Sequence, residues 1–289
     1  MIERDMHGSP WTAQAEADAL AALANFEEGL PVRLIATHRK ELQTCRAGED
    51  LRHVVRQNRA GYDHLPVEDD IGGLARIVGL LAVPRSTEHV EHGRRVESAM
   101  MPLSEEHLIG ADAGILSFVR AAHRHECRLV IVGPQIGGLV TLSDLQKLPV
   151  RAALFGIITH LEMTMAEVIR REFTEVNVWK KVLPEYRQKT IARSIQRSQA
   201  KTPAADGYVD DVLFTTFHDK LSILRAASLG GMDVASFEYD MDEIRRLRNE
   251  IAHANNYAST RAAARRTCKA VGLIDAWIDR FSRWSGSGP

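Results

Sequence analysis

The spacing of apolar residues changes character twice along the chain. In residues 11–28, "WTAQAEADALAALANFEE", apolar side chains recur every three or four positions, which predicts an amphipathic helix. Between residue 32 and about residue 148 they come instead in short β-branched runs that predict strands: "VRLIAT", "HLPV", "RIVGLLAV", "RLVIVG" and "GGLVTLS". After Pro149 these runs stop and the helical spacing returns. We therefore expect an α+β chain, in which an α/β region precedes an all-helical one.

The α/β region repeats one unit. The order helix, short strand, Gly-containing turn, strand occurs over residues 50–83 and again over residues 112–142. Two copies of one unit indicate an internal duplication in which the copies bury a shared surface. The polar segment 84–104 is expected to be a loop or a connecting piece.

Long helical stretches fill the rest of the chain. Pro184 is expected to start or kink a helix, because proline lacks an amide donor. The stretch "DGYVDDVLFTTFHDKLSILRAASLGG" has an acidic entry and a Gly-Gly exit, which are typical helix boundaries. We predict three parts: an N-terminal helix (1–29), an α/β pair (30–149) and a helical bundle (150–289).

Composition limits the classes of protein to consider. Of the 289 residues, 45% are hydrophobic and 26% charged, as in ordinary globular proteins. No apolar run approaches the ~20 residues that span a membrane, and the polar start "MIERDMHGSPW" lacks the apolar stretch of a secretory signal. The three cysteines are scattered and odd in number, which fits a reducing cytoplasm better than a disulfide framework. We therefore expect a cytoplasmic protein that does not bind a membrane.

The two halves differ in charge. Residues 151–289 hold 21 Lys+Arg against 17 Asp+Glu, a net charge of +4, and subtraction from the totals of 37 and 38 leaves 16 against 21, or −5, for residues 1–150. A mildly basic second half is compatible with a phosphate-bearing partner.

Gly138, Thr141 and Asp144 lie at the end of the last predicted strand, in "GGLVTLSDL". A hydroxyl and the backbone amides of a helix start suit a phosphate, and a carboxylate can accept hydrogen bonds from both hydroxyls of a ribose. A helix N-cap formed by Ser143 or Asp144 explains the same pattern without a ligand.

The paired segments "DHLPVEDDIGGLARIVGLL" and "CRLVIVGPQIGGLVTLSDL" resemble tandem cystathionine-β-synthase (CBS) domains, the Bateman module. The resemblance implies an adenine nucleotide (AMP, ADP or ATP) bound between the repeats through a Gly-x-x-Thr/Ser-x-x-Asp signature, which Gly138, Thr141 and Asp144 match. The first repeat, "VGLLAVPRS", offers neither the hydroxyl nor the carboxylate at the equivalent places. One nucleotide site is therefore expected rather than two.

Residues 243–256, "EIRRLRNEIAHANN", combine an arginine, an asparagine and a histidine in one predicted helix. At ~100° per residue the helix has an apolar stripe made of Met241, Ile244, Leu247, Ile251 and Ala254. His253 is then expected on roughly the opposite side, on the same face as Asn249. Arg248 flanks the stripe.

A solvated helix face or a polar subunit interface explains such a cluster without chemistry. No metal site is expected, because no second histidine or carboxylate falls at ligand spacing. Glu162, on the first helix of the bundle, could face the motif helix, but ordinary helix surface is the preferred interpretation. The functional alternative is phosphoryl chemistry, since histidine is a general acid or base near neutral pH and arginine stabilises charge on a phosphate. An RNA 2′-hydroxyl deprotonated by His253 could then attack the adjacent phosphorus without a metal.

The hexapeptide "RNEIAH" on a late helix of an all-helical region resembles the Arg-polar-x-x-x-His motif of HEPN (higher eukaryotes and prokaryotes nucleotide-binding) domains. Many HEPN proteins are metal-independent endoribonucleases that need no cofactor for catalysis and assemble the active site in a homodimer. The resemblance implies that Arg248, Asn249 and His253 are catalytic and that RNA is the substrate. Such proteins often belong to stress-response or defence systems, toxins included. The alternative is a non-catalytic nucleotide-sensing or RNA-binding dimeric adaptor of the same fold.

Overall fold

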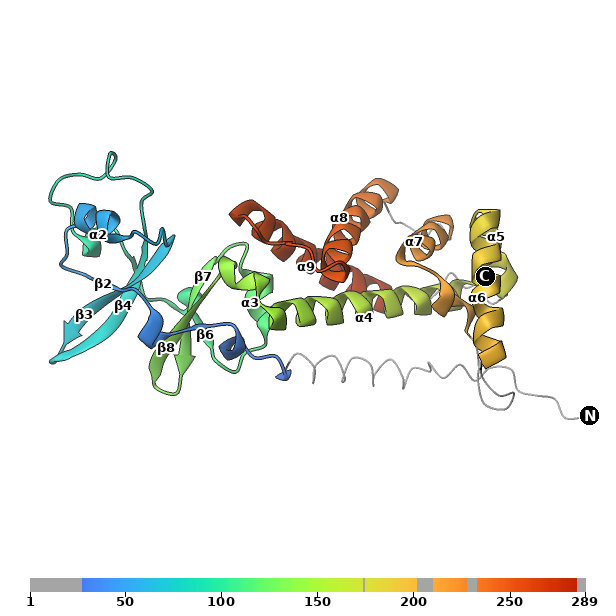
Figure 1. Cartoon of the computed structure of the whole chain (residues 1–289), viewed down its shortest axis with the longest axis horizontal. Coiled ribbons are helices and arrows are strands. Elements are labelled where there is room, and N and C mark those ends of the chain that lie inside the picture. The colour runs from blue at the N-terminus through green and yellow to red at the C-terminus, as the bar shows by residue number, and fades with distance from the viewer. Residues whose placement is uncertain (1–27, 174, 202–209, 228–232, 285–289) are drawn as a thin grey trace, which may run out of the picture. The chain divides into compact units, whose positions relative to one another are not determined.

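The structure, a computed structural model, describes residues 28–173, 175–201, 210–227 and 233–284 (Figure 1). The chain separates into two compact units. The α/β unit comprises Glu27–Ala153 and Ala258–Cys268, and the helical unit comprises Leu154–Tyr257 and Lys269–Pro289. The helix predicted for residues 11–28 falls, apart from its last residue, outside the described residues. The predicted α+β class, an α/β region followed by a helical one, is confirmed.

Two four-stranded sheets form the α/β unit. The first has the order β2-β3-β4-β5, made of Cys45–Arg46, His64–Ile71, Leu74–Ala82 and Met101–Pro102. The second has the order β1-β8-β7-β6, made of Thr37–His38, Gln135–Thr141, Cys127–Val132 and Leu108–Gly110. Helices α2 (Leu51–Gln57) and α3 (Ile115–Ala121) each follow the first strand of a repeat.

The two sheets are built on one plan. In each, a short strand pairs in parallel with the strand after the helix, and that strand forms an antiparallel hairpin with the next. A short outer strand from elsewhere in the chain completes the sheet: β5 pairs with β4, and β1 pairs with β8. The duplication predicted for residues 50–83 and 112–142 is confirmed, and each copy gains a strand before its helix.

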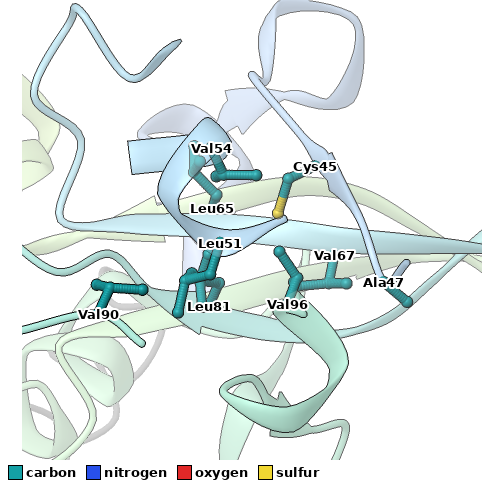
Figure 2. Close-up of a cluster of buried hydrophobic side chains, with 9 residues drawn as sticks. All are labelled: Cys45, Ala47, Leu51, Val54, Leu65, Val67, Leu81, Val90 and Val96. Carbon is teal, nitrogen blue, oxygen red and sulfur yellow. The ribbon is translucent and has the colours of Figure 1, made fainter. Parts of the chain in front are cut away.

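Helix α2 covers the first sheet with its apolar side. Its N-cap is Asp50, whose carboxylate accepts from the amide of His53 at 3.0 Å. The helix buries Leu51 and Val54, which pack into the core cluster shown in Figure 2 together with Cys45, Ala47, Leu65, Val67, Leu81, Val90 and Val96. The alternating buried positions of β3 and β4 thus face the helix that the repeat itself supplies.

One local prediction for this unit is wrong and another is incomplete. Residues Val32–Leu34 of the predicted strand "VRLIAT" form a 3-10 helix, because Val32 and Ile35 are both fully buried and the spacing of three suits a helical turn. Segment 84–104 is mostly loop but also contains a 3-10 helix (Val96–Ser98) and strand β5.

The helical unit is made of six helices and a 3-10 segment in its described part. They are α4 (Leu148–Glu172), α5 (Val176–Val182), α6 (Glu185–Lys201), η6 (Asp211–Phe214), α7 (Phe217–Ala226), α8 (Val234–Ala252) and α9 (Arg261–Ser282). Helices α4 and α9 both begin with residues of the α/β unit and end in the helical unit. Pro184 stands directly before α6, as predicted.

An aromatic cluster joins α8 and α9. The rings of Phe237 and Trp277 meet edge to face at 5.1 Å between centroids, and the ring of Phe281 lies tilted against that of Trp277 at 5.3 Å. The indole nitrogen of Trp277 donates to Asp240 at 3.0 Å. These contacts therefore anchor the first two turns of α8, at the end opposite to the motif.

Helix α7 begins later than predicted. Of the predicted entry, Asp210 caps η6 and Asp211 begins it, and α7 starts at a Thr216 cap with Asp219 as its reciprocal partner. A capping box of this kind satisfies two amides that the helix itself leaves free.

By length and composition alone, α4 is apolar enough to cross a membrane, contrary to the expectation from the sequence. The stretch responsible is 56% buried within the structure. The core helices of folded domains pass the same test, and one such helix is weak evidence.

Candidate functional site

Helix α8 positions the motif residues. Its stripe is buried as predicted through Met241, Ile244, Leu247 and Ile251. With that side packed, Arg248 is half-buried. Asn249 is exposed.

The end of α8 differs from the prediction. The helix stops one residue before His253, which is its C-cap (φ −95°, ψ 11°), and Ala254 follows with φ 54°. The amides of Ala254 and Asn255 donate to the carbonyls of Ile251 (3.3 Å) and Glu250 (2.9 Å). This is the Schellman arrangement, in which a left-handed residue closes a helix. Ala254 is exposed beyond the helix, so its predicted place in the apolar stripe is wrong.

The backbone of Ala254 is strained. A left-handed conformation costs a residue with a Cβ about 1–2 kcal/mol, and in the described residues Ala254 is the one non-glycine residue with a positive φ. Strain of this kind persists only where the surrounding structure fixes it, and it gathers at functional sites. Here it turns the chain out of the helix directly after the exposed His253.

Arg248 faces helix α4. Its Nε donates to Oε1 of Glu162 at 3.4 Å, and Oε2 of Glu162 lies 3.8 Å from Nζ of Lys220 on α7. One carboxylate therefore stands between two cations from two other helices. The interpretation of Glu162 as ordinary helix surface is wrong, because its side chain, 24% exposed, joins α4 to the motif helix.

Lys220 is a site residue that the sequence interpretation missed. It is only 6% exposed, and its Nζ donates to the carbonyl of Thr215 at 3.1 Å. A signal was available, since Lys220 stands three residues from both Phe217 and Ile223 and so lies on the apolar side of α7.

Burial lowers the pKa of Lys220 below its usual 10.5, and the positive charges of Arg248 and Arg170 act in the same direction. The carboxylates of Glu162 and Asp219 oppose this effect. Lys220 is thus a cation held in surroundings that disfavour its charge.

Arg248, Glu162 and Lys220 line a cavity of about 420 Å³ within the helical unit. Asn249 and His253 are not among its lining residues. The structure therefore brings Arg248 to the cavity and leaves the other two motif residues on the surface of the same helix end. Within the described ranges, no group of three or more His, Cys, Asp or Glu is arranged to hold a metal ion.

The residues of the CBS-like signature lie at the end of β8. Thr141 caps the following 3-10 helix, η5 (Leu142–Gln146), and forms a capping box with Asp144. Asp144 Oδ2 accepts from the amide of Thr141 at 2.7 Å and from its hydroxyl at 3.2 Å, while Oδ1 lies 2.7 Å from Nζ of Lys147. Asp144 is 6% exposed, so both oxygens already have partners inside the protein.

Gly138 has a packing role of its own. A Cβ at this position would stand 2.6 Å from the carbonyl oxygen of Thr37 on β1. The first repeat holds Gly79 at the equivalent place in β4, where a Cβ would stand 2.5 Å from the carbonyl oxygen of Met101. Each glycine therefore lets the outer strand approach its hairpin.

Comparison with protein-family models and with curated proteins found no match. Several of the solved structures to which part of the chain is similar are CBS domains. One is the CBS domain of a bacterial Mg²⁺ transporter of the CNNM/CorC family in complex with ATP, with 23% identity and a TM-score of 0.35 over 45% of this chain and 93% of that chain.

Two others are a hemolysin-like protein from Oenococcus oeni, with 14% identity and a TM-score of 0.33 over 40% of this chain and 86% of that one, and the CBS domains of a transcriptional regulator from Streptococcus pneumoniae, with 19% identity and a TM-score of 0.31 over 40% and 95%. At these TM-scores we draw no conclusion from the likeness, and the two-repeat description of the α/β unit rests on its own strand order.

Proposed function

We propose that the chain is a metal-independent endoribonuclease of the HEPN type that acts as a homodimer, and that an adenine nucleotide bound by the α/β unit regulates it. The observation that carries the proposal is the end of α8. A strained Ala254 closes the helix directly after the exposed His253. Arg248, just over one turn earlier, is anchored by Glu162.

Each residue has a role in this reaction. His253 takes the proton from an RNA 2′-hydroxyl, the oxygen attacks the adjacent phosphorus, and the 5′-oxygen leaves with a proton from a second acid. The His253 of a second copy supplies that acid across a two-fold axis. Arg248 stabilises the charge that develops on the phosphate oxygens. Asn249, exposed one turn before His253, orients the histidine or the substrate.

The anchoring of Arg248 supports its part in this scheme. The single contact to Glu162 uses Nε, and a guanidinium has five N–H donors. Within the described part of the chain, the two terminal amino groups of Arg248 have no hydrogen-bond partner among the contacts of its side chain. They are therefore available for a bidentate contact with a phosphate.

The test is cleavage of RNA in the presence of EDTA. The wild type is expected to produce 2′,3′-cyclic phosphate ends, and His253→Ala and Arg248→Ala are each expected to lower the rate about 100-fold or more. His218→Ala and Arg225→Ala are matched controls, because both side chains are exposed on α7 of the same unit. Light scattering measures the mass in solution and so tests whether the protein is a dimer.

Two results would contradict the nuclease proposal. If the wild type cuts no RNA at any nucleotide concentration, or if His253→Ala cuts as well as His218→Ala does, the nuclease proposal is wrong. Binding of RNA without cleavage would then favour the dimeric adaptor.

The nucleotide part has a separate test. AMP or ATP is expected to raise the melting temperature, because a ligand that binds only the folded state stabilises it. Asp144→Ala removes a cap as well as a proposed ribose contact, so Asp50→Ala, which removes the cap of α2 in the first repeat, is the matched control. Both variants are expected to melt earlier. Only Asp144→Ala should lose the nucleotide shift, and a shift retained in that variant places the site elsewhere.

A further inference from the structure

The cavity of the helical unit has an apolar body. Its wall includes large apolar side chains from α4, η6 and α8: Phe155, Ile158, Met163, Leu213 and Ile251. Phe155 and Leu213 are 58% and 59% exposed, so the cavity is open to solvent on this side. A volume of about 420 Å³ lies in the range of small-molecule pockets, which are typically apolar with a few polar groups that fix orientation.

One end of the cavity carries an excess of positive charge. Lys220 and Arg248 share the single carboxylate of Glu162, at 3.8 Å and 3.4 Å. Two cations and one anion leave a net charge of about +1 at this point. Because Lys220 is nearly inaccessible to water, solvent screens little of that charge.

The remaining charges near Lys220 are balanced by others. Arg170 donates to Asp210 at 2.8 Å and to Glu167 at 2.9 Å, and Glu167 also lies 3.5 Å from Nε of Arg171, so two cations stand against two carboxylates. Asp219 is bound by the guanidinium of Arg187, with Nε 3.0 Å from Oδ1. These pairs face Lys220 from α4, η6, α6 and α7 and add no free negative charge to the cavity.

We propose that this cavity binds a small amphipathic monoanion, a molecule with an apolar body and one carboxylate. The carboxylate would lie between Nζ of Lys220 and the terminal amino groups of Arg248, and the apolar body against Phe155, Ile158 and Leu213. One negative charge neutralises the excess, and the charged form of Lys220 becomes favourable again once an anion is beside it. The proposal does not rest on RNA cleavage, but it assigns the carboxylate to the same terminal amino groups of Arg248 that the nuclease proposal assigns to a phosphate, so the two ligands exclude each other at this residue.

The test uses the full chain and decanoate, below the concentration at which it forms micelles, in isothermal titration calorimetry. Decanol and decyltrimethylammonium are the probes with the same chain and a neutral or positive head. Decanoate is expected to bind, and the other two to bind at least tenfold more weakly, because a hydrogen bond to a charged group contributes about that factor or more.

Two variants move the affinity in opposite directions. Lys220→Met keeps the bulk of the side chain without the charge and is expected to weaken decanoate binding about tenfold or more. Glu162→Gln removes the internal competitor for both cations and is expected to strengthen binding, which a misfolded protein cannot imitate. Lys189→Met, at an exposed position on α6, is the matched control and should bind as the wild type does.

Equal affinity for decanoate and decanol, no binding of decanoate, or weaker binding by Glu162→Gln would each overturn the proposal. Decanoate binding by a protein that cuts no RNA would leave this inference standing and remove the nuclease proposal. The reverse pattern would remove only this inference.

Discussion

Asp219 is expected to be a large single contributor to the stability of the helical unit. It is 2% exposed at the start of α7 and accepts hydrogen bonds from Nε of Arg187 (3.0 Å) and from the amide and the hydroxyl of Thr216 (both 2.8 Å). A second bond from the same guanidinium reaches its other oxygen. The substitution Asp219→Asn keeps the shape of the side chain and removes its charge.

The magnitude follows from what remains after the substitution. Removing one partner of a fully buried ion pair costs about 3–5 kcal/mol, because the other charge stays buried without compensation. Arg187 is 20% exposed, which places the effect at the lower end. The asparagine side chain has one acceptor oxygen, and its NH2 group would face donors where the second carboxylate oxygen had accepted hydrogen bonds. We expect Asp219→Asn to lower the free energy of unfolding by about 3 kcal/mol.

Urea unfolding followed by tryptophan fluorescence measures this quantity for the helical unit. Of the four tryptophans, Trp179, Trp277 and Trp284 all lie in that unit. Asp242→Asn is the control, because its bond to Arg245 at 3.0 Å is an exposed contact within one turn of α8, worth at most about 0.5 kcal/mol. Equal effects of the two substitutions would refute the reasoning.

The effect has a defined pH dependence. Burial alone would raise the pKa of Asp219, but the hydrogen bonds from Arg187 and Thr216 together lower it below the usual 3.8. A carboxyl with a lowered pKa contributes stability that is complete above its unfolded pKa and is lost as the pH falls through the folded one. The gap between wild type and Asp219→Asn should therefore be constant at neutral pH and shrink below pH 3.8.

Four further outcomes follow from the backbone and the thiols. Ala254→Gly relieves the left-handed strain and should raise the free energy of unfolding by about 0.5–1 kcal/mol in the same urea assay; no gain would mean that this residue is not strained. Gly138→Ala brings a Cβ to 2.6 Å from the carbonyl oxygen of Thr37. It should lower the free energy of unfolding by about 1–3 kcal/mol, which calorimetry detects as a lower melting temperature. At Gly272, in α9, an added Cβ would meet no atom within 4 Å, so Gly272→Ala should raise the free energy of unfolding by about 0.5–1 kcal/mol. Burial raises the pKa of each thiol to about 12, so Ellman's reagent at pH 8 should label none of the cysteines until the chain is unfolded; they are Cys45, Cys127 and Cys268.

The repeats could be predicted because their signals are local. A glycine turn between two β-branched runs specifies a hairpin from adjacent residues, and both hairpins form where expected. The outer strands could not be predicted in this way. Strand β1 precedes the first repeat but pairs with β8 of the second, and a two-residue strand has no periodicity from which to infer its partner.

The motif helix was predicted well up to the point where its helical geometry stops. The stripe from Met241 to Ile251 depends only on the period of the helix and is buried throughout. The helix is closed by a residue with left-handed backbone angles. Glycine is the usual residue at this position, and here it is Ala254. Extending the period by two residues therefore placed Ala254 in the core by mistake.

The cavity could not be predicted, because it is made by side chains from helices far apart in the chain. Arg248 and Glu162 are 86 positions apart, and no spacing rule relates them. The buried Lys220 was the available clue, since a lysine on the apolar side of a helix must find a partner or lower its pKa.

The duplication allows the CBS-like signature to be divided into its physical parts. Both repeats keep the glycine, at Gly79 and Gly138, and in both a Cβ would meet the backbone of the outer strand. Only the second repeat, within the described residues, continues from its hairpin into a 3-10 helix, and only there do Thr141 and Asp144 close a capping box. Strand approach thus accounts for the glycine, and the cap accounts for the other two residues. A nucleotide is not needed to explain why the three residues occur together, so its binding has to be judged by whether Asp144→Ala removes a nucleotide shift that Asp50→Ala retains.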